Sequence, residues 1–263
     1  MDSLTQQIAE LEKIIYKALV PVARATPGLN VSFRDDVILI SNENLPDIDT
    51  THACLVQTSP EHIDALIAEI VDYFKMRNLP PTVFTSAACT PTDIGQRLLE
   101  LGFIRAQVEE AWMILDEIRP NQQLITGLQL KKIDEGQVLT FAEVMLTAWG
   151  LSTNLAPLMA QTLLPSMALP QVNHFLGFRN DVPIAACTLI GYDQFGIMRE
   201  PSILPAYQTN QIRADFETMV IENVRQQGVE TLLLQTTAET ASEKHFEIHG
   251  FKRSFTRAMY TLS

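Results

Sequence analysis

The chain carries a similar five-residue turn twice: Leu101-Gly102-Phe103-Ile104-Arg105 and, 148 residues later, His249-Gly250-Phe251-Lys252-Arg253. A short segment of helical periodicity precedes each turn, and a strand that contains alanine and an aromatic residue follows it: Ala111-Trp112-Met113 and Ala258-Met259-Tyr260. Further upstream, a long amphipathic helix leads through a strand into both short helices. The five-residue match is weak alone, but the shared order predicts a duplicated architecture.

Outward from these turns, hydrophobic periodicity predicts helices and strands in similar order on both sides of a linker. A first helix begins at Ser3 and is expected to end at Pro21, because proline interrupts helical hydrogen bonding. The rest of this half should contain strands at 31–33, 37–40, 53–56, 82–85 and 111–115 and helices at 60–74 and 92–101. The second half should contain strands at 128–133, 173–179, 182–190, 195–204, 230–236 and 251–262 and helices at 138–149, 155–167, 212–226 and 241–249. Turn-forming residues at 119–127 predict the linker, so the expected domains are 1–119 and 128–263.

The composition is that of an ordinary globular protein, with 46% hydrophobic and 19% charged residues in a chain of 263. No stretch approaches the roughly 20 apolar residues of a membrane helix. The first residues lack the basic start and apolar core of a signal peptide, so we expect a cytoplasmic protein. The cysteines at 54, 89 and 187 are isolated and share no metal-ligand spacing, which predicts buried, reduced side chains.

The net charge is −12, and the acidic residues are concentrated in the first half. Residues 1–119 contain 9 Lys/Arg and 18 Asp/Glu, whereas residues 120–263 contain 10 and 13. A strongly acidic chain repels the phosphates of nucleic acids and the surfaces of anionic membranes, so we expect neither as a partner. An anionic cofactor would fit the second half better than the first.

Three segments of the second half resemble a known family. They are the hairpin Phe175–Ala186, the segment Ile203–Gln208 and the segment His245–Phe251. In this order and spacing they resemble the GNAT superfamily of acyl-CoA-dependent N-acyltransferases, over about residues 128–262. The resemblance implies an α+β fold with two tandem GNAT-like domains. Each would have a mixed, mostly antiparallel sheet flanked by helices, and the first would be a degenerate copy.

The resemblance also implies a site for acetyl-CoA as co-substrate at the start of the helix near residue 212. GNAT proteins hold the pyrophosphate on backbone N–H groups of a glycine-containing loop, because the main chain must approach the phosphates closely. The matching positions here are Ile203, Leu204, Gln208, Thr209, Asn210, Gln211, Ile212, Arg213 and Ser242. Gln211 and Arg213 replace small residues of the family pattern. Either they crowd the pyrophosphate and Arg213 is merely solvated, or Arg213 supplies a guanidinium to the phosphates.

Catalytic candidates are few. Many GNAT enzymes use a tyrosine on the short helix to protonate the CoA thiolate, and Phe246 stands at that position with no proton to give. Glu200 is the candidate general base or amine ligand, and its neighbour Pro201 predicts a β-bulge. Three tyrosines are alternative acids by residue type: Tyr192, Tyr207 and Tyr260.

His245 and His249 lie four residues apart on one predicted helix, with Glu247 between them. This spacing suits a metal ion, but the order differs from the His-Glu-x-x-His motif and the sequence offers no third ligand. We therefore interpret both histidines as helix-terminal residues near the negative end of the helix dipole, and we expect no metal site.

The first half lacks room for a phosphate loop, since only Gln57-Thr58-Ser59 separates its strand from the helix start at Pro60. We expect it to be a structural partner. For the second half we expect transfer of an acyl group, acetyl first, from acyl-CoA to a small amine, and the acidic surface favours a cationic acceptor. One alternative is a catalytically inactive GNAT-fold binding or regulatory module, which Phe246 and the altered loop favour. The other alternative is that the two halves form a platform for dimerisation, in which case the chain would be a homodimer.

Overall fold

The computed structural model of the chain describes residues 3–116 and 124–262. The chain forms two compact units whose sequences interleave. The first unit contains the chain up to Trp112, together with Thr236–His245 and the segment from Arg253 onward. The second contains Met113–Gln235 and Phe246–Lys252. Within the described residues, no helix is long and apolar enough to cross a membrane.

The first unit is built from helices and strands in nearly the predicted positions. In chain order they are α1 (Ser3–Ala25), β1 (Leu29–Phe33), β2 (Ile38–Asn42), η1 (Ile48–Thr50), β3 (His52–Cys54), α2 (Ile63–Lys75), β4 (Thr82–Thr85), α3 (Ile94–Glu100), β5 (Ile104–Arg105), β6 (Glu110–Leu115) and the last strand, β12 (Lys252–Thr261). Strand β5 is too short to leave a periodic signal in the sequence, and it was not predicted.

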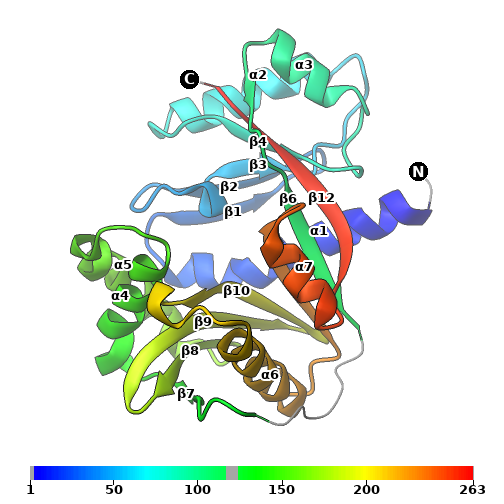
Figure 1. Ribbon diagram of the computed structural model, residues 1–263. Helices are drawn as coiled ribbons and strands as arrows, with labels where there is room; N and C mark the ends of the chain where they lie inside the picture. The colour runs from blue at the N-terminus through cyan, green and yellow to red at the C-terminus, as the bar shows by residue number, and fades with distance from the viewer. Residues whose placement is uncertain (1–2, 117–123, 263) are drawn as a thin grey trace. The chain divides into compact units, whose positions relative to one another are not determined.

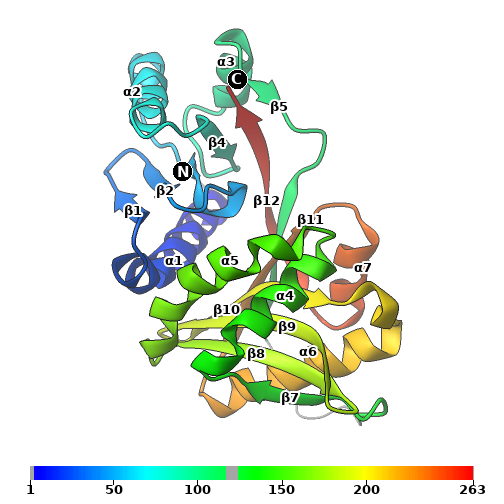
Figure 2. The ribbon, with the colours of Figure 1, turned by 90° about the vertical axis from the view of Figure 1, so that its left-hand side faces the viewer.

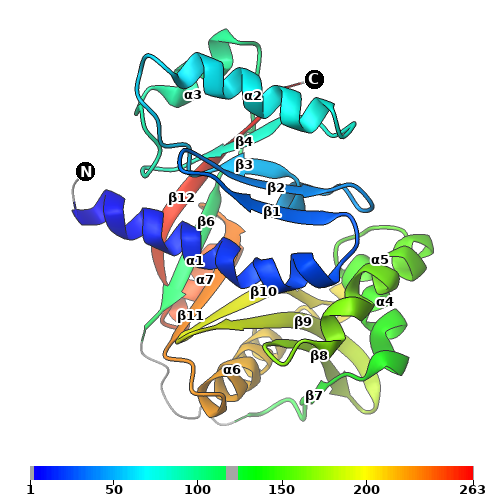
Figure 3. The ribbon, with the colours of Figure 1, turned by 180° about the vertical axis from the view of Figure 1, so that it is seen from behind.

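The sheet of the first unit is mixed. Its strand order is β1-β2-β3-β4-β12-β6, with β3 and β4 parallel and β12 antiparallel to β4. Helices α2 and α3 cover one face, where Phe74 and Leu98 pack with Val83 in a single apolar cluster. Helix α1 covers the other face (Figure 3), and its Tyr16 hydroxyl lies 2.6 Å from Nε2 of His52 in β3.

The remaining elements belong wholly or partly to the second unit, because the unit boundaries fall within β6, β11 and α7. They are β7 (Gln129–Lys132), η2 (Glu135–Gln137), α4 (Val138–Ala148), η3 (Thr153–Leu155), α5 (Ala156–Leu163), η4 (Leu164–Ala168), β8 (Val172–Arg179), β9 (Val182–Tyr192), β10 (Phe195–Ile203), η5 (Pro205–Tyr207), α6 (Asn210–Gln226), β11 (Thr231–Thr237) and α7 (Ala241–Ile248). The predicted helix at 155–167 is shorter than expected. Its last turns form the 3-10 helix η4, which carries a proline near its start.

Within the second unit the strand order is β11-β10-β9-β8-β7, antiparallel except for the β10–β11 pair. Helices α4 and α5 lie on one face (Figure 2), where Phe141 packs in one cluster with Leu176 and Ala186. Helix α6 lies on the opposite face (Figure 1). There a Cβ added at Gly177 would come within 3.3 Å of the Phe216 ring, so glycine at this position lets α6 approach the sheet closely.

The two Gly-Phe turns have the same backbone structure. Gly102 and Gly250 both adopt left-handed φ values, +88° and +93°. The N–H of Phe103 donates to the Leu98 carbonyl over 3.0 Å, and the N–H of Phe251 donates to the Phe246 carbonyl over 3.1 Å. This pattern is a helix C-cap that requires glycine at the left-handed position.

The preceding long helices also end alike. Asn78 and Gly228 follow α2 and α6 with φ of 56° and 77°. The next residue bonds back five positions in both cases, from Leu79 N–H to the Phe74 carbonyl over 3.0 Å and from Val229 N–H to the Val224 carbonyl over 3.3 Å. Two helix ends that match in order and bonding support the duplication that the sequence predicts.

The predicted end of the first helix at Pro21 is wrong, because α1 continues to Ala25. Proline removes one helical hydrogen bond. However, α1 buries an apolar stripe that includes Ile8, Ile15 and Leu19. Packing of such a stripe stabilises a helix more than local propensity does, so α1 tolerates the proline.

The last strand of the chain lies in the sheet of the first unit. Strand β12 pairs with β4 from Ala258↔Thr85 to Thr261↔Thr82. Residues 128–263, which the sequence predicts to form one domain, are therefore divided between the two compact units. The boundaries 1–119 and 128–263, as limits of the duplicated sequences, stay a prediction, and most of the linker at 119–127 lies outside the described residues.

Replacing Gly102 with alanine is expected to destabilise the first unit by about 1–3 kcal/mol, the cost of holding a side chain in a left-handed conformation. A Cβ at this position would meet only Leu262 Cδ1, at 3.8 Å, so crowding adds little. Urea denaturation measures the loss. The matched control is Gly191→Ala, whose nearest contact is 3.7 Å away and whose φ is not left-handed. Equal losses in both variants would contradict this account.

Candidate functional site

Strands β10 and β11 run side by side for a short distance and then separate. Their parallel register extends from Phe195↔Thr231 to Met198↔Leu234. Beyond Met198, β10 continues along β9 alone, and its register with β9 shifts between Arg199 and Ser202. The shift is a β-bulge, which bends a strand and increases its twist. We call the divergence of β10 and β11 beyond Met198 and Leu234 the strand opening.

The predicted bulge beside Pro201 is confirmed. Proline cannot donate a ladder hydrogen bond, so it is tolerated where pairing is already interrupted. Glu200 lies in the same bulge, but its side chain is outside the described part of the structure. Its role as a base or amine ligand therefore stays a prediction.

The segment after β10 is fixed by its own hydrogen bonds. Leu204 N–H donates to the Ile184 carbonyl over 2.9 Å, which continues the β9 contact past the end of the strand. The Gln208 side-chain amide donates to the Ile203 carbonyl over 2.9 Å, which closes the short loop containing η5. Ile203 is buried and Leu204 packs against the α4–α5 cluster. The loop is thereby held at the end of β10.

Helix α6 begins immediately after this loop and is capped by Thr209. The Thr209 hydroxyl accepts a hydrogen bond from Ile212 N–H at 3.2 Å, and the Thr209 carbonyl accepts one from Arg213 N–H at 3.0 Å. The N–H groups of Asn210 and Gln211 have no hydrogen-bond acceptor within the described residues, as expected for the first turn of a helix. Both residues are exposed. Two free N–H donors and the positive end of the helix dipole are therefore available to bind an anion at this end.

The two residues that depart from the family pattern differ in their contacts. The Gln211 side-chain amide donates to Asp215 Oδ1 over 3.0 Å, so this side chain points along α6 and not over its N-terminus. Arg213 is half-buried, and its guanidinium forms no ion pair with any residue that the structure describes. Arg213 is therefore free to bind a phosphate.

Asp215 is a structural residue of this site that the sequence did not reveal. Its Oδ2 accepts hydrogen bonds from the N–H groups of Ile125 and Thr126, at 3.0 and 2.7 Å, and from the Thr126 hydroxyl at 2.6 Å. Burial raises the pKa of Asp215, but the hydrogen bonds from Thr126, Ile125 and Gln211 outweigh it and lower the pKa overall. The ionised carboxylate thus ties the segment before β7 to the first turns of α6.

Among its described residues, the first unit has no corresponding strand opening. Its parallel pair β3–β4 is followed by a loop that fills the same place: Thr90 N–H donates to the Val56 carbonyl over 2.8 Å, and Thr58 N–H donates to the Thr90 carbonyl over 3.1 Å. The Gln57 side-chain amide adds a bond to the Ala88 carbonyl at 3.1 Å. The strands of the first unit are thus joined where β10 and β11 diverge.

No protein-family model matches the chain, and no curated protein sequence matches it. Solved structures do. A GCN5-related N-acetyltransferase from Kribbella flavida matches with a TM-score of 0.70 at 12% identity, over 96% of this chain and 94% of that chain. A tandem GNAT protein from the clavulanic acid biosynthesis pathway matches with a TM-score of 0.64 at 12% identity, over 99% of this chain and 94% of that one. This chain has the tandem GNAT fold.

A GCN5-related N-acetyltransferase from Sphaerobacter thermophilus has the same architecture, with a TM-score of 0.58 at 12% identity, over 95% of this chain and 90% of that chain. The predicted fold class, two tandem GNAT-like domains with mixed, mostly antiparallel sheets, is therefore confirmed. In this fold the strand opening and the start of α6 belong to the second unit, to which the sequence assigns the cofactor.

Phe246, at the GNAT tyrosine position, is a core residue. Its ring is 4% exposed and packs edge-on against Phe251, with centroids 5.6 Å apart. Its contact with the Gly-Phe turn explains an apolar residue there. Ser242 lies half-buried in the first turn of α7, in the part of that helix that belongs to the first unit. Its predicted contact with the cofactor stays a prediction.

The structure separates the three candidate tyrosines. Tyr260 is buried in the α2–α3 cluster of the first unit. Tyr192 pairs with Phe195 at the start of β10, about 25 Å of strand from the loop. Tyr207 alone lies beside the start of α6, in η5, where its carbonyl accepts a hydrogen bond from Thr209 N–H at 2.8 Å. His249 lies in the second unit, with Nδ1 3.9 Å from the buried Glu217 carboxylate.

Proposed function

We propose that the second unit transfers an acyl group, acetyl first, from acyl-CoA to a small amine. The observation that carries the proposal is the strand opening followed directly by the capped start of α6. The tandem GNAT fold supports it, since structures named N-acetyltransferases share that fold over nearly the whole chain. The extended, thiol-bearing arm of CoA can form hydrogen bonds with main-chain groups of β10 beyond Met198, because β10 no longer pairs with β11 there.

The reaction needs few side chains. The amine nitrogen attacks the thioester carbonyl, the C–S bond breaks and an amide forms, while the amine gives up one proton and the CoA sulfur takes one. Holding the two reactants together supplies much of the rate enhancement by itself. The pyrophosphate would bind the N–H groups of Asn210 and Gln211, with Arg213 beside them. Tyr207 is the candidate proton donor, because Phe246 has no proton to give.

The acceptor in this proposal is a small cationic amine, because a chain with a net charge of −12 attracts cations. The first unit serves as a structural partner, since a loop joins its strands where the second unit opens. The buried, apolar Phe246 also fits a second candidate, a catalytically inactive GNAT-fold binding module. Acyl transfer to an amine panel separates the two: binding of CoA without turnover selects the module.

Replacing Arg213 with alanine is expected to weaken CoA binding by about tenfold or more, because a hydrogen bond to a charged group contributes about 1.5–3 kcal/mol. The weakening should shrink as salt is raised. Calorimetric titration with CoA measures it. Gln211→Ala is the matched control, since its side chain points to Asp215, and it should change the Kd by less than about threefold. Tighter binding by Arg213→Ala would show instead that Arg213 crowds the pyrophosphate.

A further inference from the structure

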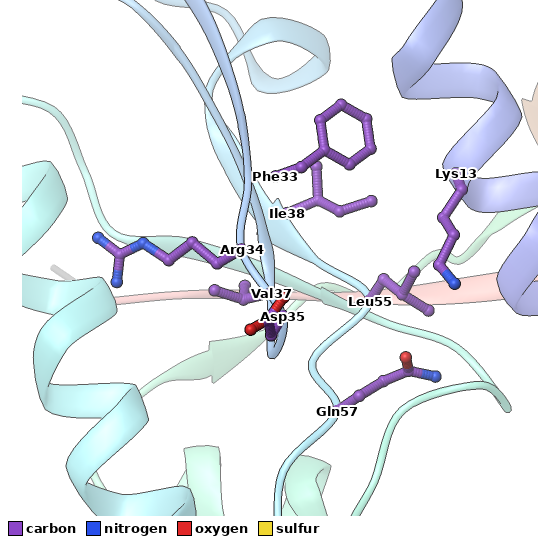
Figure 4. Close-up of a pocket in the computed structure, with 8 residues that line it drawn as sticks. All are labelled: Lys13, Phe33, Arg34, Asp35, Val37, Ile38, Leu55 and Gln57. Carbon is purple, nitrogen blue, oxygen red and sulfur yellow. The ribbon is translucent and has the colours of Figure 1, made fainter.

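A cavity lies within the first unit, between α1, the β1–β2 hairpin and the segment after β3 (Figure 4). Its volume is about 230 Å³. The proposed acyl transfer makes no use of it. It is lined by Lys13, Phe33, Arg34, Asp35, Val37, Ile38, Leu55 and Gln57.

The lining combines an apolar wall with four polar side chains: Lys13, Arg34, Asp35 and Gln57. Phe33 and Ile38 lie side by side from adjacent strands, and Lys13 reaches from α1 toward Leu55 (Figure 4). Ile38 and Leu55 are buried, while Phe33 is 40% exposed at the rim. Arg34 points away from the other labelled side chains, and its Nη1 lies 3.4 Å from Oε2 of Glu69. Lys13 is therefore the cation that faces the apolar wall.

The backbone at Leu55 is strained. Leu55 has φ of +48°, a left-handed conformation that a branched side chain adopts at a cost. The conformation ends β3 after Cys54 and turns the Leu55 side chain into the cavity wall. A costly conformation that shapes a cavity is found more often at ligand sites than in plain loops.

The charge at this cavity is balanced, unlike that of its surroundings. Residues 1–119 carry 18 acidic against 9 basic side chains, whereas Lys13 and Asp35 contribute one cation and one carboxylate to the lining, with Arg34 pointing away toward Glu69. Lys13 lies 3.0 Å from Glu10, but both side chains are exposed. A surface ion pair of this kind is weak, so a ligand carboxylate can replace or share it.

We propose that this cavity binds a short aliphatic carboxylate, with the carboxylate on the Lys13 amine and the chain against Phe33, Ile38 and Leu55. One water needs about 10–15 Å³ of this kind of volume, so a cavity of about 230 Å³ has room for a short aliphatic chain. A carboxylate of five or six carbons is short enough to fit. The site is independent of acyl transfer in the second unit.

The test is an NMR titration of the full chain, with the methyl signals of Leu55 and Ile38 as reporters. The ligands are acetate, butyrate, pentanoate, hexanoate and octanoate, with hexanamide as the uncharged counterpart of hexanoate. Affinity should rise about threefold to fourfold with each added methylene, since each one leaves water for an apolar wall. The rise should stop by octanoate, once the chain is longer than the apolar wall, and hexanamide should bind about tenfold more weakly than hexanoate.

Two variants complete the test. Lys13→Met should weaken hexanoate binding about tenfold or more, and Lys13→Arg should retain most of it. Arg34→Gln, which removes a cation that points away, should change the affinity by less than about threefold. Methyl signals that do not move, affinity without dependence on chain length, a rise that continues at octanoate, or equal losses in Lys13→Met and Arg34→Gln would each overturn the proposal.

Discussion

Replacing Arg257 with methionine is expected to destabilise the first unit by about 3–5 kcal/mol, because it removes one partner of a buried ion pair. Arg257 lies in β12 and is 2% exposed. Its Nε and Nη2 donate to Glu110 Oε2 over 2.9 and 2.6 Å, and Nη1 donates to the Tyr16 hydroxyl. Its guanidinium also lies 4.6 Å from the centre of the Phe84 ring. One side chain thus joins β12 to α1, β4 and β6.

Glu12 increases the expected loss. Its carboxylate is fully buried, and neither oxygen has a hydrogen-bond partner within the described residues. Burial raises the pKa of Glu12, and the Arg257 charge partly opposes that rise. Without Arg257 the pKa of Glu12 should rise further. A carboxyl group whose pKa is higher in the folded than in the unfolded chain stabilises the fold fully when the pH is below its unfolded pKa. That stabilisation is lost as the pH rises through the folded pKa. The variant should therefore lose more stability than the wild type between pH 5 and pH 8.

Urea denaturation of the full chain measures both effects. The matched control is Arg105→Gln, which breaks an exposed ion pair with Glu109 in the same unit and should cost at most about 1 kcal/mol. The double variant Arg257→Met with Glu110→Leu should recover much of the loss, because it also removes the largely buried carboxylate whose charge Arg257 neutralises. A loss in Arg257→Met no larger than that of the control would show that the buried pair does not hold the unit together.

Replacing Asn210 with aspartate is expected to abolish most CoA binding while leaving the fold at least as stable. Asn210 is the first residue of α6, and its N–H faces the proposed pyrophosphate position. A carboxylate about 5 Å from a phosphate charge costs about 3 kcal/mol at the effective dielectric of a protein surface, a loss of about 150- to 300-fold. The same carboxylate stabilises the helix by about 0.3–1 kcal/mol, because it lies at the positive end of the dipole.

The opposite signs of the two effects make this variant informative. Thermal denaturation should give a melting temperature equal to or above that of the wild type, so lost binding cannot be attributed to unfolding. Gln226→Glu adds the same charge at the far end of α6, about 24 Å away, and should leave CoA binding nearly unchanged. Unchanged CoA affinity in Asn210→Asp would show that the pyrophosphate does not bind at the start of α6.

Much of the architecture could be predicted from the sequence, because local signals determine it. The two Gly-Phe turns follow from glycine at a left-handed cap, and most of α6 follows from the helical periodicity of residues 212–226. The bulge in β10 is indicated by Pro201, which cannot pair. Pro21 misled the prediction because the gain from packing α1 is a tertiary effect.

The remaining features depend on partners that are distant in sequence. Arg257 reads as an ordinary polar residue of a terminal strand, and only the fold brings Glu110 and Tyr16 to it. Asp215 likewise looks like a helix surface residue until Ile125 and Thr126 are seen to donate to it. The alternation of apolar residues in β12 shows that it is a strand, but not that it pairs with β4.

Calorimetric titration of the wild-type chain with acetyl-CoA tests the central claim most directly. The account predicts saturable binding of one acetyl-CoA per chain that weakens as salt is raised, because the phosphates contact the first turn of α6 and Arg213. Two binding events per chain, or no binding by a chain shown to be folded, would contradict it.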